Sequence, residues 1–336
     1  MKKLLVTLGP SSLYPEMIRR IAKSDVYIFR LNLSHIAFDE IKTAVKMIRD
    51  NCDIPICLDS EGAQVRNQNM VGDQVFYHKG SVVKIHFSEV VGDSANISFK
   101  PNGIAKKFRI GDILHVDFDL VSFEIIGECE AGFTAVVLKS GLVKSRKAVS
   151  LNRELSMEAI QEGDRRAFEL GMTLGIKHYA LSFAGNGRDV EQVRSIVGNN
   201  SVVISKIESL SGLKNIVDII SASDELLIDR GDLSKSISLE KIPFLQRRII
   251  SMCRLHGKPI FVATNLLESM VESEVPTRAE LNDIVSTILM GADGLVLAAE
   301  TATGKYPDKV VEMASSMCKL CQRWTSNTSL TEILEM

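Results

Sequence analysis

The stretch VVISKIESLSGLKNIVDIISASDELLIDRGD, residues 202–232, contains the pattern that decides the fold. A short apolar run, Val202–Ile207, is followed by a segment with helical periodicity, and a second apolar run, Leu226–Ile228, comes next. Strands that are buried on both faces of a parallel sheet read as continuous hydrophobic runs of this kind. The stretch therefore predicts a strand, a helix and a second parallel strand.

The same alternation recurs along the chain. The other apolar runs are Leu4–Leu8, Val26–Leu33, Pro55–Leu58, His178–Phe183, Pro259–Ala263 and Gly294–Ala298. The amphipathic segments between runs include Phe38–Ile48, Asp189–Val197, Leu239–Leu255 and Arg278–Met290. Repeated units of this kind predict the α/β class and a closed (β/α)₈ TIM barrel.

One connection departs from the alternation. From Gln64 to about Met157 the sequence is β-rich and carries turn signals such as Lys79-Gly80. It predicts a small all-β lid domain inserted after the third barrel strand. Its expected strands include Val82–His86, Ile113–Val116, Phe123–Ile126 and Phe133–Leu138. The expected boundaries are 1–66 and 157–325 for the barrel, 67–156 for the lid and 326–336 for a polar tail.

Composition argues against several classes of protein. The formal net charge is −2, whereas a nucleic-acid binder would show a strongly basic patch. No window reaches the run of about 18 apolar residues that a membrane span requires. The six cysteines are scattered, which is typical of a reducing cytoplasm. We therefore expect a cytoplasmic protein that acts on small molecules, without a nucleic-acid or membrane partner.

The C-terminal ends of the strands are where a TIM barrel keeps its catalytic residues. Charges are costly inside a barrel, so the polar side chains at these ends should converge at its mouth. The strand ends contribute Arg30, Asn32, Ser34, Asp59, Ser60, Ser182, Lys206, Glu208, Asp229, Arg230, Gly231, Asp232, Thr264 and Glu300.

Lys206, Glu208 and Asp232 are the strongest candidates for chemistry. Lys206 and Glu208 lie two residues apart on one strand and therefore point the same way. Glu208 and Asp232 could hold one Mg²⁺, which is usually bound by one or two carboxylates plus substrate oxygens and water. Lys206 beside it would stabilise an enolate or a phosphoryl group. A salt bridge at the rim is the alternative for each residue taken alone.

Thr264 at the seventh strand could hold a proton or a water near the reacting carbon. The alternative is a hydroxyl that simply bonds to the backbone, which is a common role for threonine.

Eight segments of the chain resemble pyruvate kinases and occur in that family's order. They are VTLGPSS (6–12), FRLNLSH (29–35), LDSEGAQVR (58–66), ISKIESLSGLKN (204–215), SDELLIDRGDL (223–233), GKPIFVATNLLESM (257–270), PTRAELND (276–283) and AAETATGKYP (298–307). The likeness runs from Lys3 to about Arg323 and is weaker in the β-rich insert.

The resemblance implies a role for each matching residue near the metal. Glu208 and Asp232 would bind the divalent cation, Mg²⁺ or Mn²⁺, that also binds phosphoenolpyruvate or pyruvate. Lys206 would stabilise the phosphoryl group in flight, and Thr264 would be associated with protonation of enolpyruvate. Arg30 would bridge the phosphate and the monovalent-cation region.

The resemblance also implies three further groups of residues. Backbone N–H groups at Arg230, Gly231 and Asp232 would hold the substrate carboxylate, and Ser182 and Thr264 are further substrate-binding candidates. The implied monovalent site, normally for K⁺, comprises Asn32, Ser34, Asp59 and Ser60. The implied nucleotide site includes Pro10, His35 and Arg66.

Departures from the family pattern fall mostly on the nucleotide side. Glu61 and Gly163 stand where the family has lysines, and the second of those lysines contacts nucleotide phosphates. Gln64 replaces the glutamate linked to K⁺ dependence, which puts that dependence in doubt. Ala298 replaces a serine, and Asp229 replaces an alanine and so adds a carboxylate. The nucleotide site is therefore expected to be altered.

Three functions remain open on these residues. The first is a pyruvate kinase-like phosphotransferase that moves the phosphoryl group of phosphoenolpyruvate to a nucleoside diphosphate (ADP) and gives pyruvate and ATP. The alternative is a divergent paralogue that uses the metal–enolpyruvate centre for another acceptor, or for pyruvate-enolate lyase or aldolase chemistry. The third is a metabolite sensor, which would have little reason to keep Lys206 and Thr264 together.

The expected oligomer follows from the resemblance. No segment matches the family's C-terminal regulatory domain, which carries its sugar-phosphate effector site. We therefore expect no control of that type and an oligomer smaller than a tetramer, such as a homodimer.

Overall fold

The structure, a computed structural model, describes residues 2–117, 120–153, 155 and 157–336. Its contacts divide the chain into two units: a barrel unit, Met1–Gly62 with Ala159–Met336, and an inserted unit, Ala63–Glu158. The sequence led us to expect that the chain passes from the barrel into the inserted domain between residues 66 and 67 and returns between residues 156 and 157. The first crossing comes earlier because β4 (Val65–Asn67) pairs with strands of the inserted unit.

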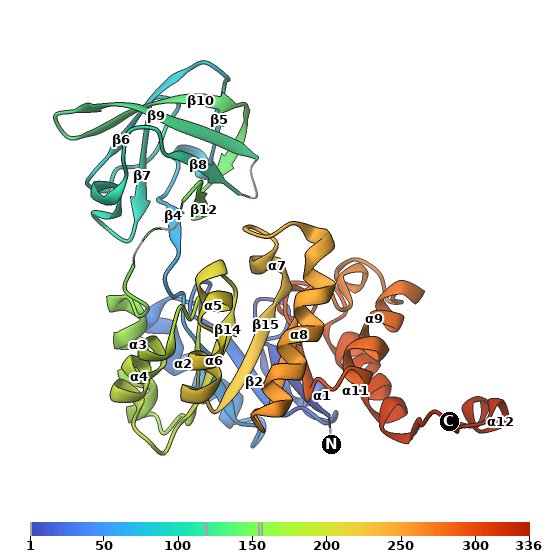
Figure 1. The fold of residues 1–336 in the computed structure, drawn as a ribbon. Helices are drawn as coiled ribbons and strands as arrows, with labels where there is room; N and C mark the ends of the chain where they lie inside the picture. The colour runs from blue at the N-terminus through green and yellow to red at the C-terminus, as the bar shows by residue number, and fades with distance from the viewer. Residues whose placement is uncertain (1, 118–119, 154, 156) are drawn as a thin grey trace. The chain divides into compact units, whose positions relative to one another are not determined.

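The barrel unit is built on eight parallel strands that close on themselves in the order β1-β17-β16-β15-β14-β13-β3-β2 (Figure 1). These strands are β1 (Lys3–Thr7), β2 (Ile28–Asn32), β3 (Ile56–Asp59), β13 (His178–Leu181), β14 (Val202–Ile207), β15 (Glu225–Asp229), β16 (Ile260–Ala263) and β17 (Gly294–Leu297). Each falls on one of the apolar runs in the sequence. The predicted fold class, a TIM barrel, is confirmed.

Helices surround this barrel. The α-helices are α1 (Pro15–Ile21), α2 (Ile41–Arg49), α3 (Glu162–Thr173), α4 (Gly187–Val197), α5 (Leu210–Lys214), α6 (Ile216–Ala222), α7 (Arg230–Leu233), α8 (Ile242–Leu255), α9 (Arg278–Leu289), α10 (Ala299–Ala302) and α11 (Pro307–Arg323). Short 3₁₀ turns are η1 (Phe38–Glu40), η4 (Leu239–Lys241) and η5 (Glu268–Val271). Local signals set their starts: Thr277 and Glu280 form a capping box on α9.

Two hydrophobic layers hold the barrel unit together. Successive residues of a strand point to opposite faces, so Leu227 packs inside the barrel while Leu226 and Ile228 pack against the helices. The inner layer consists of Leu5, Ile28, Cys57, Ala180, Ile204, Leu227, Phe261, Ala263 and Val296. The same alternation aims Lys206 and Glu208 in one direction at the end of β14.

The inserted unit forms a closed barrel of its own, in the order β10-β6-β7-β4-β12-β8-β9 (Figure 1). Its further strands are β5 (Gln74–Tyr77), β6 (Val82–His86), β7 (Asn96–Lys100), β8 (Ile113–Val116), β9 (Val121–Cys129), β10 (Gly132–Lys139), β11 (Gly141–Lys144) and β12 (Ala148–Leu151), with β5 and β11 paired as a separate ribbon. It also contains the turns η2 (Val71–Asp73) and η3 (Ile104–Lys107). The four strands expected from sequence correspond to β6, β8, β9 and β10.

The tail is less irregular than we expected. A short helix, α12 (Leu330–Leu334), begins where Ser329 and Glu332 form a reciprocal capping box. The Ser-x-x-Glu spacing was a readable signal for that helix start, but the polar composition of the tail obscured it.

Asp164 on α3 fastens the chain beside the first crossing. Its Oδ1 accepts a hydrogen bond from the Glu61 N–H at 2.7 Å, and its Oδ2 accepts one from the Gly62 N–H at 2.9 Å. Gly62 has a φ of +72°, and a Cβ there would lie 2.6 Å from the Ser182 carbonyl oxygen, so the turn requires glycine. Asp164 thereby ties the end of the third strand segment to the start of α3.

Asp164→Ala is expected to lower the free energy of unfolding by about 1–3 kcal/mol, because two backbone N–H groups lose their acceptor. Burial raises the pKa of Asp164 to about 6, so the native state binds this proton more tightly than the unfolded chain. The stability linked to that proton is present at acid pH and is lost as pH rises through about 6. Urea unfolding across this range should show the variant's deficit shrinking with rising pH. Asp164→Asn, which keeps one acceptor, should lose less, and equal stability of all three proteins would contradict the prediction.

Candidate active site

Asp59 lies at the centre of a buried charge network formed by the ends of β2, β3 and β14. Its Oδ2 lies 2.6 Å from Arg30 Nε and 3.2 Å from Lys206 Nζ. Burial tends to raise the pKa of Asp59, but Arg30 and Lys206 outweigh it and hold that pKa below its ordinary value. Asp59 is therefore a carboxylate, and the structure brings together three residues predicted from separate strands.

Lys206 is held by acceptors from three neighbouring strands. Besides Asp59, its Nζ lies 3.0 Å from Glu208 Oε1 and donates to Ser182 Oγ at 2.9 Å. Burial tends to lower the pKa of Lys206, but Asp59 and Glu208 raise it above its ordinary value. The ammonium group is therefore kept charged and fixed in direction, as catalysis by electrostatic stabilisation requires.

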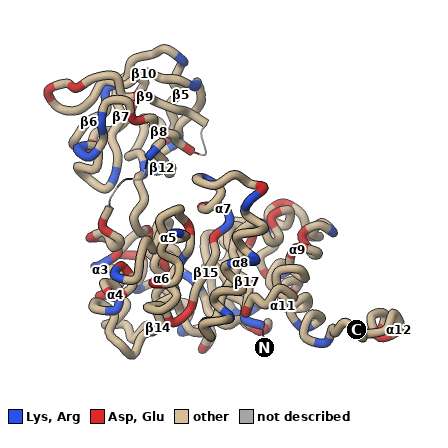
Figure 2. The backbone as a smooth tube through the Cα atoms, in the orientation of Figure 1, with Lys and Arg blue, Asp and Glu red and all other residues tan. Residues whose placement is uncertain are grey.

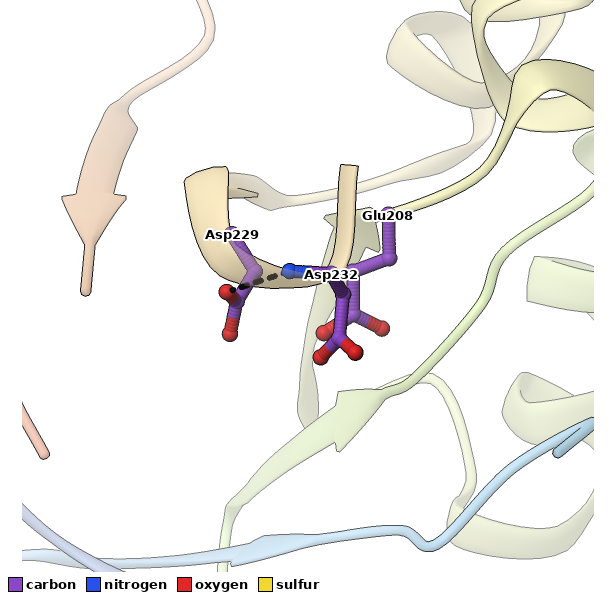
Figure 3. A group of neighbouring side chains, drawn as sticks. All are labelled: Glu208, Asp229 and Asp232. Carbon is purple, nitrogen blue, oxygen red and sulfur yellow. Dashed lines mark hydrogen bonds between the residues drawn. The ribbon is translucent and has the colours of Figure 1, made fainter. Parts of the chain in front are cut away.

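Three carboxylates lie together beside this lysine. One oxygen from each of Glu208, Asp229 and Asp232 lies within 4.8 Å of the others, and Figure 3 shows their side chains gathered at the turn after β15. Burial raises the pKa of Glu208 to about 8, and Asp232 and Asp229 add to the effect although Lys206 opposes it. Glu208 Oε2 accepts a hydrogen bond from the Phe183 N–H at 2.7 Å, whereas Oε1 forms only the ion pair with Lys206 among the described residues, without hydrogen-bond geometry.

This cluster fits a divalent cation. Carboxylate oxygens are the ligands of Mg²⁺ and Mn²⁺. A 2+ charge would favour the ionised forms of Glu208 and Asp229, whose pKa values are raised by burial and by the neighbouring carboxylates. The structure brings the predicted ligands Glu208 and Asp232 together and adds Asp229. One signal for that addition is readable in the sequence, namely the extra carboxylate of Asp229 in the Asp-Arg-Gly-Asp turn.

Thr264 faces the same turn from the end of β16. It has a φ of +72°, which is unusual for a β-branched residue and is typical of strained functional positions. Its Oγ1 donates to the Ala263 carbonyl at 2.6 Å and accepts from the Gly231 N–H at 2.9 Å. The Thr264 hydroxyl is thus bonded to backbone, in line with the alternative role considered for it, and one of these bonds comes from Gly231 in the turn that carries Asp229 and Asp232.

Arg230 points to the outer side of this turn. Its Nη1 lies 2.6 Å from Asp283 Oδ2 on α9, and its Nε donates to the Thr264 carbonyl at 3.1 Å. A cavity of about 420 Å³ borders Arg230 and Gly231 and is walled by residues of α8 and α9. The Arg230 side chain therefore supports the turn, while the backbone groups of Gly231 and Asp232 face the carboxylate cluster.

The residues of the implied monovalent site are neighbours in the structure. Asn32 and Asp59 are paired in register on β2 and β3, and Asn32 Oδ1 accepts from the Ser34 N–H at 3.0 Å. Ser60 Oγ accepts from the Ser182 N–H at 2.9 Å, and Ser182 Oγ donates to the Ser60 carbonyl. These residues form hydrogen bonds with one another and with the residues around Asp59. Their role in K⁺ binding stays a prediction.

The implied nucleotide residues are divided between the two units. Pro10, in the turn after β1, and His35, in the turn after β2, are exposed on the barrel unit. Arg66 lies on β4 of the inserted unit and donates from Nη1 to the Arg146 carbonyl at 3.0 Å. Their common nucleotide role also stays a prediction.

Comparisons with known proteins agree with this geometry. The family model "Pyruvate kinase, barrel domain" matches residues 1–311. The pyruvate kinase of Thermotoga maritima is 31% identical over 330 residues, which cover 96% of this chain and 71% of that protein. A pyruvate kinase of Agrobacterium vitis is 33% identical over 340 residues, covering 99% and 70%.

A solved structure gives the same answer. The crystal structure of a pyruvate kinase from Cryptosporidium parvum superposes with a TM-score of 0.84 at 29% sequence identity, covering 97% of this chain and 70% of that one. The barrel topology, the family model and relatives that match nearly the whole chain all point the same way: this chain belongs to the pyruvate kinase family.

Proposed function

We propose that this chain transfers the phosphoryl group of phosphoenolpyruvate to a nucleoside diphosphate such as ADP, giving pyruvate and ATP. One observation carries the proposal. Lys206 is buried, charged and fixed beside three carboxylates suited to a divalent cation. Phosphoryl transfer depends mainly on such positioning and charge stabilisation.

The residues of the chain would divide the work. Lys206 would offset the charge that spreads over the phosphoryl oxygens as the bond to the enolpyruvate oxygen breaks and the bond to the diphosphate oxygen forms. Arg30, close to Lys206 through Asp59, would bind the phosphoryl group from the other side. The N–H groups of Gly231 and Asp232 would hold the substrate carboxylate.

A Mg²⁺ or Mn²⁺ ion held by Glu208 and Asp232 would act as a Lewis acid on enolate and phosphoryl oxygens. Thr264, whose hydroxyl is oriented by Ala263 and Gly231, would deliver or position the proton that the enolpyruvate carbon accepts. Ser182 would keep Lys206 Nζ aligned during the transfer.

Pyruvate release from phosphoenolpyruvate is the direct test. We expect turnover with at least one nucleoside diphosphate, loss of turnover when a chelator removes the divalent cation, and no turnover without diphosphate. Adding and omitting K⁺ in the same assay tests the monovalent site. Absence of turnover with every diphosphate would overturn the proposal.

The divergent alternative predicts other products. Oxaloacetate decarboxylation, or proton exchange at pyruvate without nucleotide, would favour it, but the names of the relatives support phosphotransfer instead.

The proposed alteration of the nucleotide site is tested by Gly163→Lys. The space around a Cβ at Gly163 is open, so the lysine can be accommodated, and its charge should lower the KM for ADP with little change in the KM for phosphoenolpyruvate.

A small-molecule enzyme in the cytoplasm, without nucleic-acid partners, belongs to the same proposal. Acidic and basic residues are interspersed along the chain in Figure 2, and all six cysteines are free thiols. Among the described residues, no helix combines the length and apolar character that crossing a membrane would require.

A homodimer is the proposed assembly. Leu239 and Phe244 expose 72% and 74% of their surface around the start of α8, an apolar area that a second copy could cover. Light scattering of the native protein and of Phe244→Glu tests this: a monomeric wild type would overturn it.

A further inference from the structure

Asp229 is the N-cap of α7, and its side chain accepts hydrogen bonds from two backbone amides beside the carboxylate cluster. Its Oδ1 accepts hydrogen bonds from the Gly231 N–H at 3.1 Å and from the Asp232 N–H at 3.3 Å. Figure 3 shows the Asp229 carboxylate turned back onto the Asp232 N–H. A Cβ built on Gly231 would lie 3.4 Å from the same oxygen, so the carboxylate packs directly against the turn.

Asp229 is also a full member of the carboxylate cluster. It is 7% exposed, and one of its oxygens lies within 4.8 Å of ligand oxygens of Glu208 and Asp232. Basic side chains already pair with the other two members of the cluster: Lys206 Nζ lies 3.0 Å from Glu208 Oε1, and Lys235 pairs with Asp232, whereas Asp229 forms no ion pair with a described residue. The turn therefore presents an additional negative charge where an anionic ligand of the metal would approach.

We propose that Asp229 is a specificity-determining residue that competes with the carboxylate of the substrate for the amides of Gly231 and Asp232. The inference rests on the proposed function, which places the substrate carboxylate on these amides. Its consequence is tighter binding of the divalent cation and weaker binding of the anionic substrate. The third carboxylate strengthens the hold on a divalent cation, while the anionic substrate must displace the Asp229 side chain and approach its charge.

The ligand consequence follows from the chemistry of the amides. Each N–H group is a single donor, so a ligand oxygen and Asp229 Oδ1 cannot both accept the same hydrogen bond at full strength. Asp229→Ala removes the charge and frees the Asp232 N–H, while the Gly231 N–H keeps only its hydrogen bond to Thr264 Oγ1 at 2.9 Å. Asp229→Asn removes the charge but keeps an acceptor at the amides. The two variants separate competition for the amides from repulsion.

Calorimetric titration of the full chain tests the proposal with two probes, Mn²⁺ alone and phosphoenolpyruvate at saturating Mn²⁺ without nucleotide. We expect Asp229→Ala to bind phosphoenolpyruvate about tenfold more tightly, or about 1.4 kcal/mol, and to bind Mn²⁺ alone less tightly. Asp229→Asn should lie between the wild type and Asp229→Ala for phosphoenolpyruvate. Asp50→Asn, at an exposed acid that follows the C-terminus of α2, is the control and should match the wild type.

Two outcomes separate this inference from the proposed function. If wild type and Asp229→Ala bind phosphoenolpyruvate equally tightly, the inference is wrong and the proposed function stands. If no variant binds phosphoenolpyruvate, the proposed function falls and takes the inference with it.

Discussion

Lys206→Met is expected to lower kcat for pyruvate formation by about a hundredfold to a thousandfold, because a fixed charge at the transition state contributes about 3–4 kcal/mol. Methionine at position 206 cannot supply the positive charge that the lysine places there. Its ammonium group is positioned by Asp59, Glu208 and Ser182 at once, and methionine fills a similar volume without the charge. Since the proposed function places the substrate carboxylate on the Gly231 and Asp232 N–H groups, kcat should fall far more than the KM for phosphoenolpyruvate rises.

Steady-state kinetics of purified variants measure this effect. Lys305→Met is the matched control, because Lys305 is a largely exposed lysine that pairs only with the exposed Glu272 among the ion pairs of the described residues. Circular dichroism should show that Lys206→Met is folded. A variant that retains kcat within tenfold of the wild type would show that Lys206 does not stabilise the reacting group. The sensor hypothesis, in contrast, requires a wild type that binds phosphoenolpyruvate without turnover.

The barrel could be predicted because its strands are buried on both faces. Such strands leave continuous apolar runs, and all eight runs correspond to strands of the closed sheet. In the inserted unit, β5 and β11 expose several of their residues and are only four residues long, so no apolar run marked them. The contacts divide the chain between Gly62 and Ala63, before the expected boundary at 66–67, because the pairing of β4 depends on partners far away in sequence.

Only those site residues whose positions follow from strand geometry could be predicted from the sequence. The two-residue period of a strand placed Lys206 beside Glu208, and the parallel barrel placed Asp59 near both. The hydrogen bonds of Asp229 to its own turn were missed, because they depend on where α7 begins after β15. Asp164 was missed as well, since its partners lie more than one hundred residues earlier in the chain.

Asp59→Asn is expected to cause the largest loss of stability, about 3–5 kcal/mol, because it leaves two buried cations without their shared counter-charge. Asp59 is fully buried, and Arg30 and Lys206 expose only 7% and 6% of their side chains. Asp308→Asn is the matched control. Asp308 is also buried, but its partner Arg20 is half exposed, so water can solvate the cation when the charge is removed and the loss should be smaller.

The pH dependence distinguishes this charge effect from a simple packing effect. Arg30 and Lys206 hold the pKa of Asp59 below its ordinary value, despite burial. The stability that this carboxylate contributes is therefore present above its ordinary pKa and is lost as pH falls through the lowered one. Urea unfolding at neutral pH should show the full loss of unfolding free energy in Asp59→Asn, and this loss should shrink toward acid pH.

Adding Arg30→Met to Asp59→Asn should restore part of the lost stability, since one uncompensated cation is removed with it. A deficit that is independent of pH and unchanged in the double variant would mean that Asp59 acts through its shape, and that the charges of Arg30 and Lys206 do not depend on it.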